Sequence, residues 1–197
     1  AEIAHAVALG GDEIILHDTH ERVLCAALAQ ISRAVDQGVR LGKVDAFAAR
    51  RVKRAFTLTL DLKKCSEADI VIEAIPDTLD AKQTLFRTLD NLVARKTILA
   101  TSTNTISVTR LAATTRHPER VIGLHFFKPA HIIRLVEIVR GLNSGAEEID
   151  QAVALVRRIG KTPVVLADIP GLIVNQIAMT YCFEALHLLD QGALDEE

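Results

Sequence analysis

The chain has 197 residues, of which 49% are hydrophobic and 24% are charged, a balance that fits one globular domain or one domain with the start of another. Its 23 basic and 25 acidic residues are spread along the chain and leave a formal net charge of -2. This distribution argues against nucleic acid and membrane surfaces as partners, and favours a small molecule. No apolar run approaches the ~18 residues that a membrane span needs.

The three cysteines indicate a reducing compartment. Cys25, Cys65 and Cys182 are an odd number, lie far apart and lack the spacing of zinc ligands. They are interpreted as reduced core thiols of a cytoplasmic protein, and neither a disulfide nor a metal site is expected.

The first part of the chain alternates helical and strand patterns. Residues 1–11 have an apolar stripe at helical spacing that ends on two glycines, and residues 13–18 form a short strand that ends on an acid. Residues 20–37 are predicted to be an amphipathic helix with a glycine as its stop. Residues 39–57 are predicted to be a charged helical excursion from the sheet, with a solvated face.

A parallel strand and a polar loop follow. Residues 70–75 are apolar nearly throughout, as expected for a strand covered on both faces, and residues 77–93 have helical spacing. Residues 97–101 form the next strand, and the polar run 102–105 follows at its C-terminal end. Because ligands in open α/β sheets lie beyond the C-terminal ends of the strands, this loop is a candidate site.

A histidine and a carboxylate occupy the next two strands, after a short helix at residues 108–114. His125 lies near the end of the run 120–129, and Glu137 lies within the run 134–139. If the strands are neighbours, Glu137 can hold one imidazole nitrogen while the other faces a cleft, which is the arrangement of a general base. The alternative is a buried pair that satisfies only itself.

The last elements are a helix at residues 147–159, a strand at residues 163–167 and a long apolar helix at residues 172–189 that carries Asn175 in its first turn. The apolar side of that helix has nothing after it in the sequence to cover it. It is interpreted as the first helix of a helical domain.

The predicted fold class is α/β, with a Rossmann-like, doubly wound and mostly parallel sheet, followed by the first helix of an all-α C-terminal domain. Residues 1–170 form the predicted Rossmann-like domain, and residues 171–197 form the start of the helical domain.

Several short fragments of the sequence together carry a resemblance to a known family. They are Ala68 to Ile75, Lys82 with Leu85-Phe86, Ile98 to Thr101, Gly123 to Pro129, Leu135 to Glu137, Gly160-Lys161 and Pro170 to Asn175.

In this order and spacing these fragments resemble the L-3-hydroxyacyl-CoA dehydrogenase family, which includes bacterial 3-hydroxybutyryl-CoA dehydrogenases. The resemblance covers nearly the whole chain. It implies NAD as cofactor, an acyl-CoA substrate and a homodimer formed through a helical domain. The implied reaction is the oxidation of the 3-hydroxyl of an (S)-3-hydroxyacyl-CoA to the 3-oxoacyl-CoA.

The resemblance also implies roles for residues around the substrate. His125 would be the catalytic base, Glu137 the carboxylate that orients it, and Asn175 a polar group near the substrate carbonyl. In the polar loop, Ser102 and Asn104 would contact the substrate, and Asn104 and Asn175 would belong to the catalytic set as well. Asn104 stands where the family has a serine, and its amide can still donate a hydrogen bond to a substrate oxygen.

Four further residues are predicted to contact NAD. Asp18 ends a strand where an acid commonly binds the adenosine ribose, with a turn cap as its alternative. Asp77 and Lys82 match family positions at the cofactor, and their alternatives are a helix N-cap and an exposed helix lysine. Lys128 replaces the family's asparagine, and it would attract a phosphate or carboxylate or turn to solvent.

One departure from the family affects the whole cofactor site. Family members begin with a strand and a G-x-G-x-x-G loop, and Ala1 follows the expected position of the last of these glycines. The sequence is therefore expected to be partial, without that strand and loop. Two alternative functions stay open: a related dehydrogenase for a free hydroxy acid, favoured by Ser102, Thr103 and Lys128, or a catalytically silent, crystallin-like relative.

Overall fold

The computed structural model describes residues 1–192 of the chain, in which helices and strands alternate. In chain order the elements are α1 (Glu2–Leu9), β1 (Ile14–His17), α2 (Glu21–Arg40), α3 (Ala46–Arg54), β2 (Phe56–Thr59), η1 (Leu62–Glu67), β3 (Ile70–Glu73), α4 (Leu79–Leu92), β4 (Ile98–Thr101), α5 (Val108–Ala112), η2 (Pro118–Arg120), β5 (Val121–Phe126), β6 (Leu135–Arg140), α6 (Ala146–Arg158), β7 (Thr162–Ala167) and α7 (Leu172–Asp190). The end of the predicted second domain, residues 193–197, lies outside the described residues.

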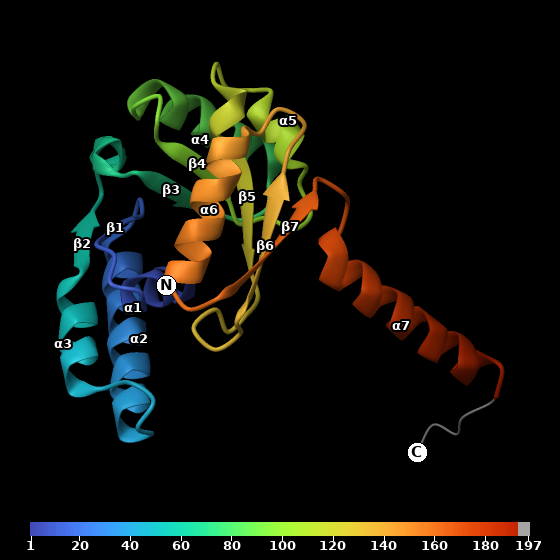
Figure 1. Ribbon diagram of the computed structural model, residues 1–197, viewed down its shortest axis with the longest axis horizontal. Helices are drawn as coiled ribbons and strands as arrows, with labels where there is room; N and C mark the ends of the chain where they lie inside the picture. The colour runs from blue at the N-terminus through green and yellow to red at the C-terminus, as the bar shows by residue number, and fades with distance from the viewer. Residues whose placement is uncertain (193–197) are drawn as a thin grey trace.

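The strands form two sheets. β1 and β2 pair in parallel, and the larger sheet has the order β3-β4-β5-β6-β7. Every pair in the larger sheet is parallel except β5 with β6, which is antiparallel. The predicted α/β class with a mostly parallel sheet is therefore confirmed (Figure 1).

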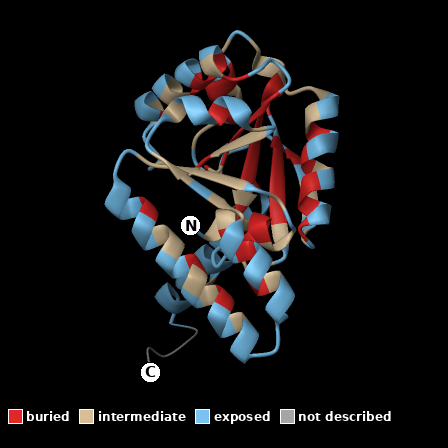
Figure 2. Ribbon diagram, turned by 90° about the vertical axis from the view of Figure 1, so that its left-hand side faces the viewer, coloured by how far each residue is buried: buried red, intermediate tan, exposed pale blue. Residues whose placement is uncertain are grey.

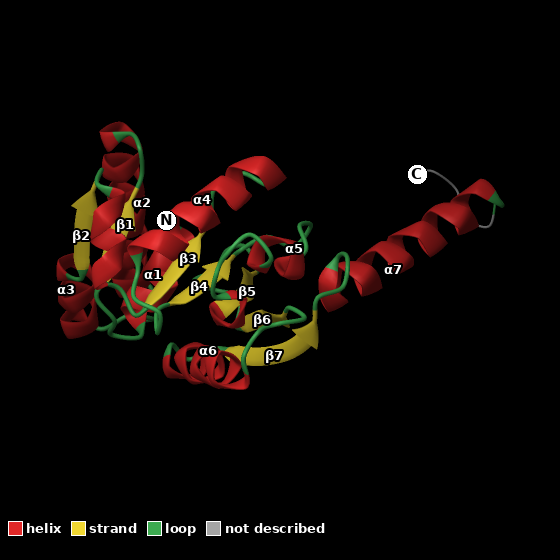
Figure 3. Cartoon of the chain, turned by 90° about the horizontal axis from the view of Figure 1, so that it is seen from above, coloured by secondary structure: helices red, strands yellow, loops and turns green. Residues whose placement is uncertain are grey.

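Helices cover both faces of the larger sheet, which is why its strands are apolar nearly throughout. α4 and α5 lie on one face and α6 on the other (Figure 3). Side chains alternate along each strand, so Ile98 and Ala100 of β4 join the core beneath α6 whereas Leu99 joins the core beneath α4 and α5. Buried residues accordingly concentrate in the strands between these helices (Figure 2).

The smaller sheet packs beside α2 and α3, whose Val35 and Val52 are fully buried. The predicted solvated face of the charged segment is confirmed, because its basic side chains on α3 are exposed; these are Arg50, Arg51, Lys53 and Arg54. β2 is not predicted from the sequence. This strand has only four residues directly after a helix, so its own pattern is too short to distinguish it from that helix.

Two local predictions are wrong. α2 continues through Gly38 to Arg40, and the left-handed backbone that ends it is at Gly42, with a φ of 66°. Of the three cysteines only Cys65 is buried, whereas Cys25 on α2 and Cys182 on α7 are exposed, because each lies on a helix surface that no other element among residues 1–192 covers.

The predicted long last helix is confirmed as α7, which projects away from the rest of the molecule (Figure 1). Leu172 is 3% exposed, whereas Ile177 and Tyr181 are 67% and 75% exposed. With 19 residues and a mean hydropathy of 1.3, α7 is long and apolar enough to cross a membrane by length and composition alone. The expectation that no segment reaches this length is therefore wrong, although core helices of soluble proteins pass the same test.

Candidate active site

His125 and Glu137 face each other across β5 and β6. The two strands are antiparallel and the two residues are register partners, so their side chains leave the same face of the sheet. Nδ1 of His125 lies 2.8 Å from Oε2 of Glu137. The Glu137 side chain is 2% exposed and the His125 side chain 12%, so the imidazole is the member of the pair that reaches solvent. The predicted pairing of the two strands is confirmed.

The second oxygen of Glu137 binds the start of α7. Oε1 accepts hydrogen bonds from the backbone amides of Ile173 and Val174, each at 3.1 Å. The N-cap of α7 is Gly171, which has no side chain to cap the helix, so Glu137 supplies the cap from another strand. From the sequence, Glu137 is expected to bind His125 alone. The feature of the sequence that points to its second role is an apolar helix that begins without a capping residue.

The backbone at the start of α7 is strained. Gly171 has a φ of 76° and Leu172 a φ of 55°, and the left-handed conformation is unfavourable for leucine. The buried side chain of Leu172 and the two amides bound to Glu137 hold this conformation. The carboxylate and the helix therefore fix each other.

Asp18 follows β1 at the C-terminal edge of the parallel strands. One carboxylate oxygen accepts a hydrogen bond from the backbone amide of His20 at 2.9 Å, which is the turn-capping contact expected as the alternative role. Its side chain nevertheless remains 35% exposed. Turn capping and ligand binding are therefore compatible at this position.

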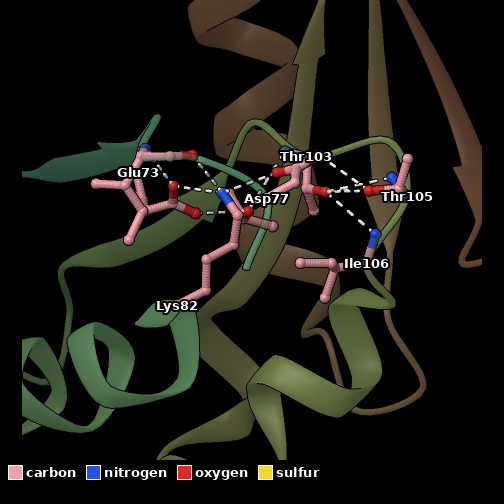
Figure 4. Close-up of polar contacts among 8 residues, drawn as sticks. Glu73, Asp77, Lys82, Thr103, Thr105 and Ile106 are labelled. Atoms are coloured by element: carbon pink, nitrogen blue, oxygen red, sulfur yellow. Dashed lines mark hydrogen bonds and ion pairs between the residues drawn. The ribbon is translucent and has the colours of Figure 1, made fainter. Parts of the chain in front are cut away.

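Asp77 and Lys82 form one cluster after β3 (Figure 4). The N-cap of α4 is Thr78, so the N-cap role of Asp77 is wrong; its Oδ1 lies instead 3.2 Å from Nζ of Lys82, and its Oδ2 accepts from Oγ1 of Thr105 at 2.9 Å. Lys82 is fully buried, so its alternative as an exposed helix lysine is wrong too. The buried carboxylate of Glu73, which the local pattern of α4 does not reveal, draws this lysine inward.

The polar loop after β4 is organised by Thr103, a residue that is not among the predicted site residues. Thr103 is 3% exposed, and its Oγ1 accepts hydrogen bonds from the backbone amides of Thr105 and Ile106 at 3.2 and 3.1 Å. Such side-chain contacts fix the shape of a turn. The half-buried Ser102 and Asn104 flank Thr103, so both predicted substrate-binding residues belong to a loop of defined shape.

Asp168, predicted only as part of a turn, joins the end of β7 to the start of α5. Its carboxylate accepts from Oγ of Ser107 at 2.7 Å and from the amides of Val108 and Thr109 at 3.1 and 2.8 Å. Burial alone would raise the pKa of Asp168, but these hydrogen bonds together outweigh burial and lower the pKa. Because α5 packs against β5, Asp168 supports the strand that carries His125.

Lys128 and Asn175 lie on segments that are attached to the pair. Lys128 is exposed in the turn after β5, three residues beyond His125. Asn175 is half-buried in the first turn of α7, directly after the residues whose amides bind Glu137. Within residues 1–192 no hydrogen bond joins either side chain to His125 or Glu137.

A cavity of about 530 Å³ lies between the two sheets. Its lining includes Ile14 and Leu16 of β1, Ile70 and Ile72 of β3, and Ala1 at the start of α1. β1 pairs only with β2 and β3 only with β4, so each has an edge with no strand partner in the described part of the chain. The cavity is therefore bordered by apolar and charged side chains, and by backbone groups that are able to pair with a further strand.

A mostly parallel sheet with helices on both faces is the architecture of dinucleotide-binding domains. The family described as 3-hydroxyacyl-CoA dehydrogenase, NAD binding domain, matches residues 1–169. The chain therefore belongs to the 3-hydroxyacyl-CoA dehydrogenase family, and the sequence resemblance is confirmed.

Individual relatives agree with this assignment. The chain is 37% identical over 191 residues to 3-hydroxyadipyl-CoA dehydrogenase of Escherichia coli (strain K12), which covers 97% of this chain and 40% of that protein. It is 32% identical over 195 residues to the probable 3-hydroxybutyryl-CoA dehydrogenase of Bacillus subtilis (strain 168), at 99% and 68% coverage. The crystal structure of (S)-3-hydroxybutyryl-CoA dehydrogenase from Ralstonia eutropha has a TM-score of 0.95 at 29% identity, over 99% of this chain and 69% of that one. The predicted Rossmann-like fold is confirmed.

Proposed function

We propose that this chain forms the NAD-binding and catalytic part of a dehydrogenase that oxidises the 3-hydroxyl of an (S)-3-hydroxyacyl-CoA to the 3-oxoacyl-CoA. The observation that carries the proposal is the His125–Glu137 pair, in which a buried carboxylate holds a more exposed imidazole. Oxidation of a secondary alcohol needs a base for the hydroxyl proton while a hydride leaves the same carbon, and this pair provides the base.

Proton transfer would take place at Nε2 of His125. When Nδ1–H donates to Oε2 of Glu137, the neutral ring has its lone pair on Nε2, which accepts the substrate proton. The carboxylate then stabilises the imidazolium. Since the amides of Ile173 and Val174 occupy the other carboxylate oxygen, Glu137 cannot rotate away and the ring keeps its orientation. The ring of Phe127, edge-on to His125 at 4.6 Å between centroids, supports it from another side.

The residues after β1 and β3 fit a dinucleotide. The partly exposed carboxylates of Asp18 and Asp77 suit ribose hydroxyls, because a carboxylate is an acceptor of hydrogen bonds. The first turn of α1 has backbone amides without partners inside the helix and no side-chain cap, an arrangement that suits a phosphate. NAD, when bound, supplies the hydride acceptor. We assign Lys128, an exposed cation, to the phosphates of the cofactor or of coenzyme A.

Substrate contacts are assigned to the polar loop and α7. Ser102 and Asn104 offer a hydroxyl and an amide at the C-terminal end of β4, and Asn175 offers an amide on the helix bound to Glu137. Each can donate to an oxygen of the thioester or of the 3-hydroxyl. These three residues would hold the substrate while His125 acts on it.

The full-length protein is proposed to be cytoplasmic and larger than one Rossmann-like domain. A further parallel strand would fill the cavity between β1 and β3 and complete one continuous sheet. α7 would be the first helix of an all-α domain, which covers its exposed apolar side chains and forms a homodimer. Residues 1–170 and 171–197 would then belong to different domains.

Turnover tests the proposal. Full-length protein given NAD and (S)-3-hydroxybutyryl-CoA should form NADH, and His125→Ala should lower kcat by about 10²–10⁴-fold with NADH binding intact. Arg33→Ala, on the exposed surface of α2, is the control. Preference for a free 3-hydroxy acid over its thioester would support the alternative that the protein is a dehydrogenase of free hydroxy acids. A folded protein that turns over neither compound would support the alternative that it is a catalytically silent relative.

A further inference from the structure

Two histidines meet where α1 packs against the turn that joins β5 and β6. His5 lies on α1 and is only 4% exposed, and His131 lies in the turn and is half-buried. The centroids of the two rings are 5.1 Å apart, and the rings are tilted by 33°. Neither side chain has a part in the proposed reaction, so the reason for burying two imidazoles here is a separate question.

Each ring buries one nitrogen atom without satisfying it. Among the described residues 1–192, neither Nε2 of His5 nor Nδ1 of His131 has a hydrogen-bond partner. Buried polar atoms without a partner are costly and therefore rare in native proteins. Two of them on neighbouring rings point to a ligand that both nitrogens bind.

Both histidines line one small cavity. Its volume is about 20 Å³, which is enough for one water molecule or one ion. Glu2 and Gln30 also line it, and Gln30 on α2 is exposed, so the cavity has a route from solvent. A ligand that enters is confined between α1, α2 and the turn.

The spacing of the two rings fits a metal ion with tetrahedral coordination. An imidazole nitrogen lies about 2.0–2.1 Å from zinc, which places the ring centroid about 3.2 Å from the ion, and two such rings at the tetrahedral angle have centroids roughly 5 Å apart. The observed separation is 5.1 Å. Burial, together with the charge of His131, lowers the pKa of His5 to about 4, so this ring is neutral at pH 7, which is the form that binds metals.

Another contact already holds the two segments together. Oε2 of Glu2 accepts a hydrogen bond from the backbone amide of Ala130 at 3.0 Å, although the two residues are 128 positions apart in the sequence. Glu2 lies one turn before His5 on the same helix, and Ala130 directly precedes His131. The protein therefore fixes the two rings beside each other before any ligand binds, which lowers the entropic cost of binding.

We propose that His5 and His131 form a binding site for one divalent transition-metal ion, for which Zn²⁺ is the best match. Nε2 of His5 and Nδ1 of His131 are the two protein ligands. Water completes the coordination, because the described part of the chain has no group of three or more His, Cys, Asp or Glu side chains placed to hold a metal. The ion would fasten α1 to the turn after β5.

This site is separate from the His125–Glu137 pair and does not rest on the proposed function. It replaces the expectation that the chain has no metal site, which was based on the spacing of the cysteines. The two histidines come from elements far apart in the sequence, so no local spacing of ligands could reveal them.

Titration with Zn²⁺ tests the proposal in full-length protein from which metals have been removed with EDTA. Calorimetry should show one bound Zn²⁺ that depends on this site, and Zn²⁺ should raise the melting temperature, because it binds only the folded chain. Mg²⁺ should do neither, since it prefers oxygen ligands. X-ray absorption at the zinc edge should show two imidazole nitrogens at about 2.0–2.1 Å.

Two conservative variants separate an ion from a water molecule. His5→Gln and His131→Asn each place an amide where the ligating nitrogen was, and an amide binds water well but transition metals poorly. Each variant should lose the bound Zn²⁺ and the rise in melting temperature. His117→Gln, which changes a half-buried histidine before η2, is the matched control and should keep both.

The opposite outcomes overturn the proposal. Zn²⁺ binding that persists in both His5→Gln and His131→Asn would place the ion elsewhere. A folded wild-type protein that binds no Zn²⁺ would mean that the cavity holds water only. If neither variant folds, the ligand set seen by X-ray absorption in the wild type decides, and any set other than two imidazoles with oxygen ligands would refute the site.

Discussion

Replacing Glu137 by glutamine separates the catalytic role of this carboxylate from its structural one, because the shape is kept and the charge is lost. Glutamine has one acceptor oxygen and one NH2 group. The oxygen must face the amides of Ile173 and Val174, since an NH2 group there would meet two donors. The NH2 group then faces Nδ1 of His125, which has to accept. The ring proton moves to Nε2, and the base loses its lone pair.

The two expected effects of Glu137→Gln differ in size. A wrong tautomer removes general-base catalysis, so kcat should fall by about 10²–10⁴-fold, whereas NADH affinity should not change. All three hydrogen bonds lose their charge assistance, so the free energy of unfolding should fall by only about 1–3 kcal/mol. Glu137→Ala should lower the free energy of unfolding further than Glu137→Gln does, because it leaves the backbone amides of Ile173 and Val174 without an acceptor.

Steady-state kinetics, NADH titration and urea unfolding of the same proteins provide the assay. Asp150→Asn, on the exposed surface of α6, is the matched control and should resemble the wild type in all three. A folded Glu137→Gln protein with a kcat near that of the wild type would refute the tautomer argument and reduce the pair to a structural contact. Lost NADH affinity with unchanged kcat would assign Glu137 to the cofactor site.

Two further predictions concern stability and association. Burial, together with the charge of the adjacent His131, lowers the pKa of His5 to about 4, in a small cavity that Glu2 also lines. In the unfolded chain His5 binds a proton as the pH falls below its usual pKa of 6.5, whereas in the folded chain it does so only near pH 4. The free energy of unfolding should therefore fall by up to about 3 kcal/mol as the pH drops from 6.5 to about 4. Urea unfolding at several pH values should show this loss in the wild type and not in His5→Gln. Ile177 and Tyr181 are exposed, and leaving each of these side chains in water gives up roughly 1.5–3 kcal/mol of burial free energy. This chain should therefore self-associate, whereas the double variant Ile177→Glu/Tyr181→Glu should not. A wild-type chain that sediments as a monomer at high concentration would contradict the uncovered face of α7.

The sequence by itself determined the local elements and the central pair of the site. The apolar spacing of α6 and the continuous apolar run of β3 lie within their own residues, so each could be predicted without knowing its neighbours. The contact between His125 and Glu137 was also predictable, because strands that follow each other along the chain usually pair.

Only the tertiary structure decided which polar residues are buried and what they bind. Lys82 lies on an amphipathic helix, where a lysine is expected to be exposed, and it is buried because the carboxylate of Glu73 on another element meets it. The amides bound by Glu137 are 36 and 37 residues away, and the Val108 amide bound by Asp168 is 60 residues away. A buried charge is stable only where its partners converge, and that convergence depends on how distant elements pack, which no local pattern of spacing contains.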